Sequence, residues 1–235
     1  MVPDYPVTLF VSKEGYLKKI TAQSLRMSGE QKFKEGDSLS FSCETTNRAE
    51  ILVLTDKCQC YKSRLSDFDD GKASLLGDYL PQKLGFEAGE NVMQVLLPGD
   101  YKGFALFFFE NGKAAKVPLS AYETKLNRKK LTGAYSDKSP LKAAFALQAD
   151  QQMAVYTTDS RCVIFSTAQL LPKTTRNTQG VAVVSLKKKA AVTHAVAVEN
   201  SGIVNLSRYR SKTIPTAGAI LKPEDAPEKQ ISFEV

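Results

Sequence analysis

The sequence VTLFVSKEGYLKKITAQSL (residues 7–25) sets the pattern for the whole chain: an apolar run, a polar tight turn, a second strand with basic residues and a short Ser-containing ending. Self-similarity of this kind is the signature of a repeat architecture. The chain is therefore predicted to be an array of repeated units. The further copies are EILVLTDKCQCYKSRLSDF (50–68), FALFFFENGKAAKVPLSAY (104–122), QMAVYTTDSRCVIFSTAQL (152–170) and AVAVENSGIVNLSRY (195–209).

A tight turn joins the two strands of each repeat. Successive turns lie roughly four dozen residues apart. Glu-Gly, Asn-Gly and Ser-Gly supply the positive φ that short hairpin turns require, and Asp-Lys and Asp-Ser are weaker versions. Each unit is therefore expected to contain a β-hairpin. The equivalent turn residues are Gly15, Cys58, Gly112, Ser160 and Gly202.

The first strand of each repeat is apolar on both faces, as in residues 51–54 and 107–109. Such a run indicates cover on both sides, which stacked blades provide. Further short apolar runs occur at 39–43, 92–97, 141–147 and 181–186. The Ala-rich run near 141–148 leaves a local helix open, although the repeat register favours a strand. The prediction is an all-β, propeller-like array of about five four-stranded blades in a single domain. Its units are residues 7–49, 50–103, 104–151, 152–194 and 195–235.

The charge balance favours a polyanionic partner. The 32 Lys and Arg residues exceed the 25 Asp and Glu residues, which gives a net charge of +7. Such a surface attracts nucleic acid or an anionic membrane, and the sign of the charge does not choose between them. No apolar run is long enough to span a bilayer, and charged residues are present from Asp4 onward. We therefore expect neither a signal peptide nor a membrane anchor, and a cytoplasmic location.

The cysteines and the single histidine point to no catalytic or metal chemistry. Cys43, Cys58, Cys60 and Cys162 are too few for a disulfide framework and are expected to be reduced thiols. Only a Cys-x-Cys spacing and His194 are available, and zinc sites require other spacings. No Gly-rich phosphate loop or nucleophile-base set occurs, so we expect no catalytic residue, metal or cofactor in this chain.

Two motifs in the same repeat register carry a resemblance to a known family. VTLFVSKEGYLKKI (7–20) is similar to the first-blade strand pair of the C-terminal domain of the A subunit of bacterial type IIA topoisomerases, DNA gyrase and topoisomerase IV. RNTQGVAVVSLKK (176–188) is similar to the repeated connector of that domain, Arg-x-x-x-Gly-Val followed by an apolar strand. The resemblance extends over essentially the whole chain.

The resemblance implies a β-pinwheel, in which neighbouring blades exchange strands and duplex DNA bends on a basic rim. It places the catalytic tyrosine in a separate N-terminal part of the subunit, so this chain is expected not to be an enzyme by itself. The implied partners are double-stranded DNA, that catalytic part and the ATPase B subunit, with ATP and Mg²⁺ needed only by the full enzyme. Natural chains of this family begin far upstream, so Met1 is expected to be an added initiator.

One segment departs from the family pattern. Gyrase carries a box close to Gln-Arg-Arg-Gly-Gly-Arg-Gly after its first hairpin and uses it for tight wrapping and negative supercoiling. Residues 26–36 of this chain read RMSGEQKFKEG, which keeps cations and glycines but introduces Glu30 and Glu35. The departure favours a topoisomerase IV-like or divergent gyrase-like chain over a supercoiling gyrase.

Non-specific DNA affinity comes from many dispersed cations that neutralise phosphates and release counterions. Each basic cluster follows a turn or a second strand, so equivalent clusters are expected on one rim. The alternative is a protein-interaction platform whose basic rim meets an acidic protein; affinity that ignores DNA length would favour it. The predicted DNA-binding residues are Lys18, Lys19, Arg26, Lys32, Lys34, Lys62, Arg64, Lys113, Lys116, Arg128, Lys129, Lys130, Arg161, Lys173, Arg176, Lys187, Lys188, Arg208, Arg210 and Lys212.

Other features receive structural interpretations. His194 and the recurring tyrosines Tyr16, Tyr61, Tyr122 and Tyr209 are expected to pack, because duplex bases are not exposed for stacking. The second unit has the least basic connector and is expected to contribute least to DNA binding. The acidic tail 223–230 is expected to be a linker or an autoinhibitory strip. Residues 231–235, ISFEV, are predicted to form a final strand that closes against the first blade.

Overall fold

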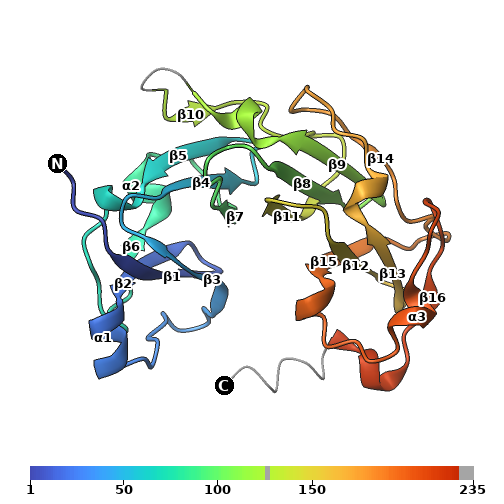
Figure 1. Ribbon diagram of the computed structural model, residues 1–235, viewed down its shortest axis with the longest axis horizontal. Coiled ribbons are helices and arrows are strands. Elements are labelled where there is room, and N and C mark those ends of the chain that lie inside the picture. The colour runs from blue at the N-terminus through green and yellow to red at the C-terminus, as the bar shows by residue number, and fades with distance from the viewer. Residues whose placement is uncertain (125–127, 228–235) are drawn as a thin grey trace. The chain divides into compact units, whose positions relative to one another are not determined.

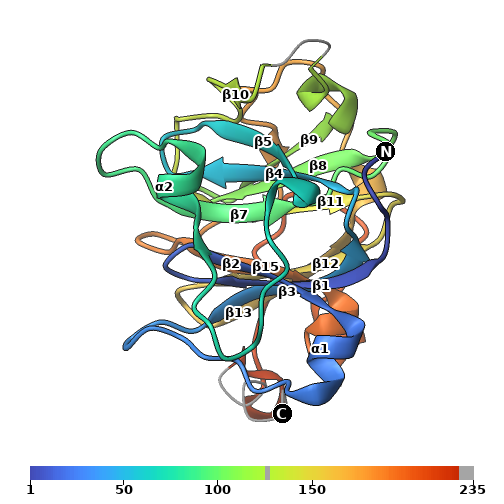
Figure 2. The ribbon, with the colours of Figure 1, turned by 90° about the vertical axis from the view of Figure 1, so that its left-hand side faces the viewer.

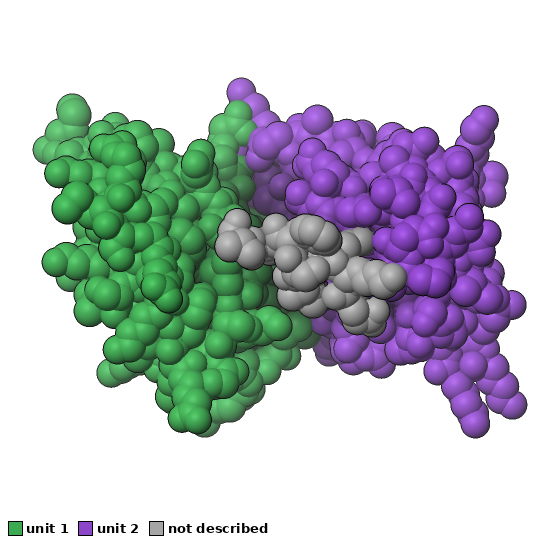
Figure 3. All heavy atoms as spheres, turned by 90° about the horizontal axis from the view of Figure 1, so that it is seen from below, with its two compact units in different colours: residues 1–100, 122–134 green, residues 101–121, 135–235 purple. Residues whose placement is uncertain are grey.

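The computed structural model describes residues 1–124 and 128–227. Within them, the strands form four four-stranded sheets, which we call A to D in chain order (Figure 1). The chain divides into two compact units (Figure 3). Unit 1 comprises residues 1–100 and 122–134 and holds sheets A and B; unit 2 comprises residues 101–121 and 135–235 and holds sheets C and D.

The sheets share one strand order, in which a central hairpin is flanked by a third and a fourth strand. Sheet A has the order β3(Leu39–Thr46), β1(Pro6–Ser12), β2(Tyr16–Thr21), β6(Asp78–Tyr79). Sheet B has β10(Lys130–Leu131), β5(Cys60–Arg64), β4(Glu50–Thr55), β7(Val92–Leu96). Sheet C has β11(Leu141–Leu147), β8(Phe104–Phe109), β9(Lys113–Pro118), β14(Val181–Ala182). Sheet D has β15(Val192–Ala197), β12(Gln152–Thr157), β13(Arg161–Ser166), β16(Ala219–Ile220).

The helices are short and lie in the connections. None that the described residues form is long and apolar enough to cross a membrane. The α-helices are α1(Ala22–Met27), α2(Leu80–Leu84) and α3(Leu206–Tyr209). The 3₁₀ turns are η1(Leu65–Asp67), η2(Leu119–Tyr122), η3(Thr167–Gln169), η4(Val198–Asn200) and η5(Pro223–Asp225).

The four central hairpins confirm the predicted turns. In each turn the amide of the predicted residue donates to the carbonyl three residues earlier, as from Gly15 to Ser12 at 3.1 Å and from Ser160 to Thr157 at 3.2 Å. The turn residues have positive φ, 98° at Gly15 and 87° at Gly112, and also 55° at Cys58 and 58° at Ser160. The backbone thus follows the repeat even where the sequence lacks glycine.

The fourth strand of each sheet comes from a later part of the chain. In sheets A to C it lies in the connector that follows the next hairpin: β6 pairs with β2, β10 with β5 and β14 with β9. This is the strand exchange that the family resemblance implies. Gly180 opens β14 at φ 73°, and a Cβ there would lie 1.9 Å from the carbonyl oxygen of Ala114. The glycine of the Arg-x-x-x-Gly-Val motif therefore allows the exchanged strand to approach β9.

The core of each unit lies between its two sheets. In unit 1, Val7 and Leu9 of β1 pack in one cluster with Ile51 and Val53 of β4. In unit 2, residues of β8, including Phe108, pack in one cluster with residues of β12 and β13. β4 and β8 are buried on both faces, as their continuous apolar runs predicted. The Ala-rich run at Leu141–Leu147 forms strand β11, as the repeat register favoured.

The prediction of about five blades was wrong, because the described part of the fifth repeat, residues 195–227, forms no sheet of its own. The apolar run with which this repeat begins lies in β15, the third strand of sheet D, which pairs with β12. The apolar run at 181–186 does not form one long strand: Val181–Ala182 form β14, the fourth strand of sheet C, and Val184 makes an isolated parallel bridge with Thr216. Later in the fifth repeat, Ile203 and Tyr209 cover the outer face of sheet D, where they pack with residues of β12 and β13. The predicted strand 231–235 and the end of the tail, 228–230, lie outside the described residues.

Candidate nucleic-acid interface

Three lysines predicted to bind DNA are buried, and this part of the prediction was wrong. The exposed fraction is 4% for Lys18, 3% for Lys19 and 5% for Lys116. All three lie in second strands of hairpins, β2 and β9, whose central residues are buried on both faces. A strand covered on both sides leaves its lysines no route to a DNA phosphate.

Lys19 and Lys116 occupy equivalent positions, four residues after their turns, and make equivalent contacts. The Nζ of Lys19 donates to Asn47 Oδ1 at 2.6 Å and to the Leu65 carbonyl at 3.0 Å. The Nζ of Lys116 donates to Asp150 Oδ1 at 2.8 Å and to the Thr167 carbonyl at 3.2 Å. Leu65 and Thr167 are the first residues of η1 and η3. Each lysine therefore ties one sheet of its unit to the turn that follows the hairpin of the other.

Lys18 lies on the opposite face of β2 from Lys19, because side chains alternate along a strand. Its Nζ donates to the carbonyls of Lys32 at 3.0 Å and Ala73 at 3.1 Å and lies 5.5 Å from the centre of the Phe33 ring. Burial lowers the pKa of Lys18. The ammonium group joins the loop 28–38, which contains most of the segment that replaces the gyrase box, to the connector 71–77.

The exposed cations of unit 1 gather on α1, the loop 28–38 and the connectors. Thr21 caps α1 by accepting a hydrogen bond from the Ser24 amide at 3.2 Å. Lys62 and Lys130 are half-buried and paired with Glu50 at 3.4 Å and Glu87 at 3.1 Å. The predicted residues that are exposed in this unit are Arg26, Lys32, Lys34, Arg64, Arg128 and Lys129.

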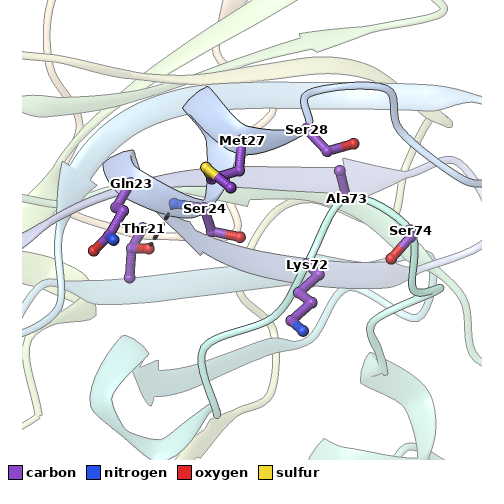
Figure 4. A pocket seen from close by; sticks show the side chains of 8 residues that line it. All are labelled: Thr21, Gln23, Ser24, Met27, Ser28, Lys72, Ala73 and Ser74. Atoms are coloured by element: carbon purple, nitrogen blue, oxygen red, sulfur yellow. Dashed lines mark hydrogen bonds between the residues drawn. The ribbon is translucent and has the colours of Figure 1, made fainter.

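A hollow of about 400 Å³ lies between α1 and the connector that follows η1 (Figure 4). Its lining includes Lys72, an exposed cation that sequence reasoning missed. The sequence cue that could have revealed Lys72 was its position beside Gly71. This connector runs back past β2 (Figures 1 and 2), and the Gly71 amide donates to the Lys19 carbonyl at 2.7 Å. The lining residues are Thr21, Gln23, Ser24, Met27, Ser28, Lys72, Ala73 and Ser74.

In unit 2, several lysines on the connections are exposed, while several arginines anchor the backbone. Arg161 donates to the Gly218 carbonyl at 3.1 Å, and Arg176 donates to the Ala121 carbonyl at 3.0 Å. Arg208 is exposed, yet its guanidinium holds the Ile220 carbonyl at 2.9 and 3.0 Å. Lys113, Arg161 and Arg176 are half-buried. The predicted residues that are exposed in this unit are Lys173, Lys187, Lys188, Arg208, Arg210 and Lys212.

The second repeat places acidic residues where other repeats place cations. Asp67, Asp69 and Asp70 follow β5 and are exposed. Asp70 accepts hydrogen bonds from Tyr5 at 2.9 Å and pairs with Lys19 at 3.2 Å. A polyanion is repelled from such a surface. That this repeat contributes least to DNA binding stays a prediction.

Three of the recurring tyrosines pack as predicted and also anchor hydrogen bonds. Tyr61, Tyr122 and Tyr209 are buried. Their hydroxyls donate to Glu90 at 2.7 Å, to the Ala134 carbonyl at 2.6 Å and to Asp225 at 2.7 Å, respectively. None of these rings is available to a base.

His194 and Tyr16 are structural residues as well. The ring of His194 stacks on Tyr156 with 4.5 Å between centroids and 11° between planes. Tyr16 is half-buried, with its ring centroid 4.9 Å from that of Tyr79.

Comparison with known proteins agrees with this architecture. The chain matches the sequence model of the DNA gyrase C-terminal domain, a β-propeller, over residues 8–41 and 158–199. Each matched segment spans at least a second hairpin strand and the connection that follows it, and the two contain the motifs at 7–20 and 176–188 almost completely.

Curated relatives include the A subunits of DNA topoisomerase 4. The protein from Staphylococcus aureus is 24% identical over 215 residues, which is 89% of this chain and 27% of the relative. The protein from Staphylococcus epidermidis is 27% identical over the same shares. The chain thus spans about a quarter of the length of the curated relatives it matches.

Solved structures show the same fold. The C-terminal domain of DNA topoisomerase IV has a TM-score of 0.76 at 19% identity and covers 94% of this chain and 73% of that one. The E. coli ParC C-terminal domain has a TM-score of 0.64 at 13% identity and covers 93% and 95%. Together, these matches show that the chain is similar in sequence and fold to the C-terminal domains of the A subunits of DNA gyrase and topoisomerase IV.

Proposed function

We propose that this chain binds duplex DNA without sequence specificity and bends it, as the accessory C-terminal part of a type IIA topoisomerase A subunit. The observation that carries the proposal is the placement of exposed cations on the connections between strands in both units. Cations on separate connections suit contact with a backbone that carries one phosphate charge per about 1.7 Å of helix axis. They offer no arrangement for reading base edges.

The contrast between buried and exposed lysines supports the same proposal. Lys19 and Lys116 make structural contacts inside the fold, so a phosphate backbone would meet the exposed cations instead, most of which lie on the connections. Bending DNA over such a surface costs a few kcal/mol of elastic energy, which additional phosphate contacts offset.

The parent enzyme is proposed to resemble topoisomerase IV more than a supercoiling gyrase. Residues 26–36 lack the gyrase box and carry Glu30 and Glu35 among their cations. The acidic side chains weaken the local attraction for phosphate and therefore oppose the tight wrap that supercoiling needs.

The proposed partners beyond DNA are the ATPase subunit of the enzyme and the catalytic part of the subunit to which this chain belongs. Cleavage chemistry, ATP and Mg²⁺ would belong to those parts, and the whole enzyme would act in the cytoplasm. This chain would supply only the DNA-bending surface.

Fluorescence anisotropy with duplexes of 20 and 80 base pairs over a salt series tests the proposal. Each phosphate neutralised adds about 0.9 to the slope of log affinity against log salt. Tighter binding of the longer duplex with a slope of several units is the expected result. Weak binding that ignores duplex length would overturn the proposal in favour of a protein-interaction platform.

A further inference from the structure

The loop 28–38 is held at three places. At its start, the Ser28 amide donates to the Ser24 carbonyl at 3.1 Å. At its end, Asp37 Oδ1 accepts from the Glu14 amide at 3.0 Å and the Ser38 carbonyl accepts from the Lys13 amide at 2.9 Å. The start of the loop is thus fixed to helix α1, and its end is fixed to the turn between β1 and β2. The middle of the loop, which carries Lys32 and Lys34, needs its own anchor.

That anchor is the ammonium group of Lys18. It reaches from β2 to the carbonyls of Lys32 and Ala73, while the Lys32 amide donates to the Ala73 carbonyl at 2.8 Å. The Phe33 ring lies against the same ammonium group. Hydrogen bonds from a charged donor are about twice as strong as neutral ones, and burial strengthens them further.

The geometry differs from that of the other buried lysines. Lys19 and Lys116 each have a carboxylate partner and tie one sheet to another element of the core. Lys18 has two backbone carbonyls and an aromatic ring as partners, and both carbonyls belong to exposed connections that carry cations, Lys32 and Lys34 on one and Lys72 on the other.

We propose that Lys18 is a positioning residue for DNA binding: its buried ammonium group fixes the loop 28–38 against the connector 71–77, so that their exposed lysines form one phosphate-contact surface. This inference rests on the proposed function. Lys18 itself touches no DNA. Preorganised cations bind a phosphate backbone more tightly than mobile ones because the loop entropy is lost before binding.

A double-mutant cycle in the full chain tests this role. The variants are Lys18→Met, Lys32→Ala/Lys34→Ala, and the combination, with binding of an 80-base-pair duplex measured in 0.1 M salt. Removal of the two loop cations is expected to weaken binding by roughly fivefold to tenfold for each phosphate that is no longer neutralised. If Lys18 acts through the loop, Lys18→Met weakens binding and the combined variant binds within about twofold of the double variant.

Hydrogen exchange provides the readout that a general loss of stability does not produce. Exchange at the Lys32 amide is expected to accelerate in Lys18→Met while the amides paired between β1 and β2 keep their protection. Lys19→Met is the matched control, since it removes a neighbouring buried lysine that contacts no part of the loop. It should leave Lys32 exchange and DNA affinity near the wild-type values.

The outcomes separate this inference from the proposed function. Wild-type affinity of Lys18→Met beside a weakened loop double variant, or additive losses in the combined variant, would overturn the positioning role alone. Unchanged affinity in the loop double variant would count against the loop as a DNA contact and hence against the proposed function. If Lys18→Met does not fold, Phe33→Ala replaces it in the cycle, because this half-buried ring can be removed without opening the core.

Discussion

The outer faces of sheets A and D are covered in different ways. On sheet D the cover is apolar: Ile203 and Tyr209 of the fifth repeat pack on Ala154 and Ile164. On sheet A the loop 28–38 and the connector 71–77 meet over Lys18, and their contact is made by hydrogen bonds and one aromatic ring. One cover completes a core, whereas the other holds exposed lysines in place.

The difference shows that sheets built from the same repeat can be covered for two different purposes. Burial of large apolar side chains contributes several kcal/mol and ties the cover to the fold. A polar cover contributes less to stability, since each net hydrogen bond is worth about 1 kcal/mol, but it leaves its outer surface free for charge. Of these two covers, the one that carries lysines proposed to contact DNA has the weaker attachment.

The largest expected effect comes from removing the apolar cover. Tyr209 is 2% exposed, and Tyr209→Ala is expected to lower the free energy of unfolding by about 3–5 kcal/mol through cavity formation and loss of the hydrogen bond from its hydroxyl to Asp225. Phe33→Ala, in the cover of sheet A, should cost about 1 kcal/mol. Urea denaturation measures both values. Equal losses of unfolding free energy in the two variants would contradict the claim that the two covers are attached differently.

A smaller effect is expected at the exchanged strand. Gly180→Ala should cost about 2–4 kcal/mol, because the new methyl group would lie 1.9 Å from the Ala114 carbonyl oxygen in addition to its positive φ. Gly36, in the loop over sheet A, has φ 81° with open space around it. Gly36→Ala should therefore cost only about 1 kcal/mol. Thermal and urea unfolding would contradict this account if Gly180→Ala were the milder change.

The pH response should also distinguish the two covers. Burial raises the pKa of Asp225, but hydrogen bonds from Asn205, Tyr209 and the Val204 amide outweigh it and hold the pKa below its ordinary value. A lowered folded-state pKa adds stability above the unfolded pKa of about 3.9, and this stability is lost as pH falls through the folded pKa.

Asp225→Asn should therefore reduce the loss of stability between pH 6 and pH 3. Urea midpoints measured across this range test the expectation, with Asp69→Asn, an exposed carboxylate outside this cover, as the control. An unchanged acid response in Asp225→Asn would show that the cover of sheet D does not depend on this carboxylate.

The hairpins and the resemblance to gyrase and topoisomerase IV C-terminal domains were predictable from the sequence, because turn chemistry and apolar runs are local signals. Cys58 and Ser160 show this, since their place in the repeat predicted a positive φ that the residue types alone do not. The fate of the fifth repeat was not predictable. Its apolar run 195–198 fits a first or a third strand equally well, and only pairing with β12 decides between them.

Sequence reasoning about the candidate site was also limited to what local signals reveal. Cations on connections, such as Lys34 and Lys187, were predicted from charge alone and are exposed in the structure, and their contact with DNA stays a prediction. Lys18, Lys19 and Lys116 were misassigned because a lysine in a strand normally marks a wet face. The second strand is covered on both sides, and the carbonyls and carboxylates that receive these lysines come from distant segments that no local pattern reveals.

The central claim is that exposed connector cations, rather than cations already paired with carboxylates, bind DNA. The salt dependence of duplex affinity in Arg26→Ala/Lys32→Ala/Lys34→Ala tests it most directly. The matched control is Lys57→Ala/Lys142→Ala, whose lysines pair with Glu87 at 3.8 Å and Glu110 at 3.0 Å. The account predicts that the first variant lowers the slope of log affinity against log salt by about 2–3 and the control by less than about 1. Equal slopes in the first variant and the wild type would contradict it.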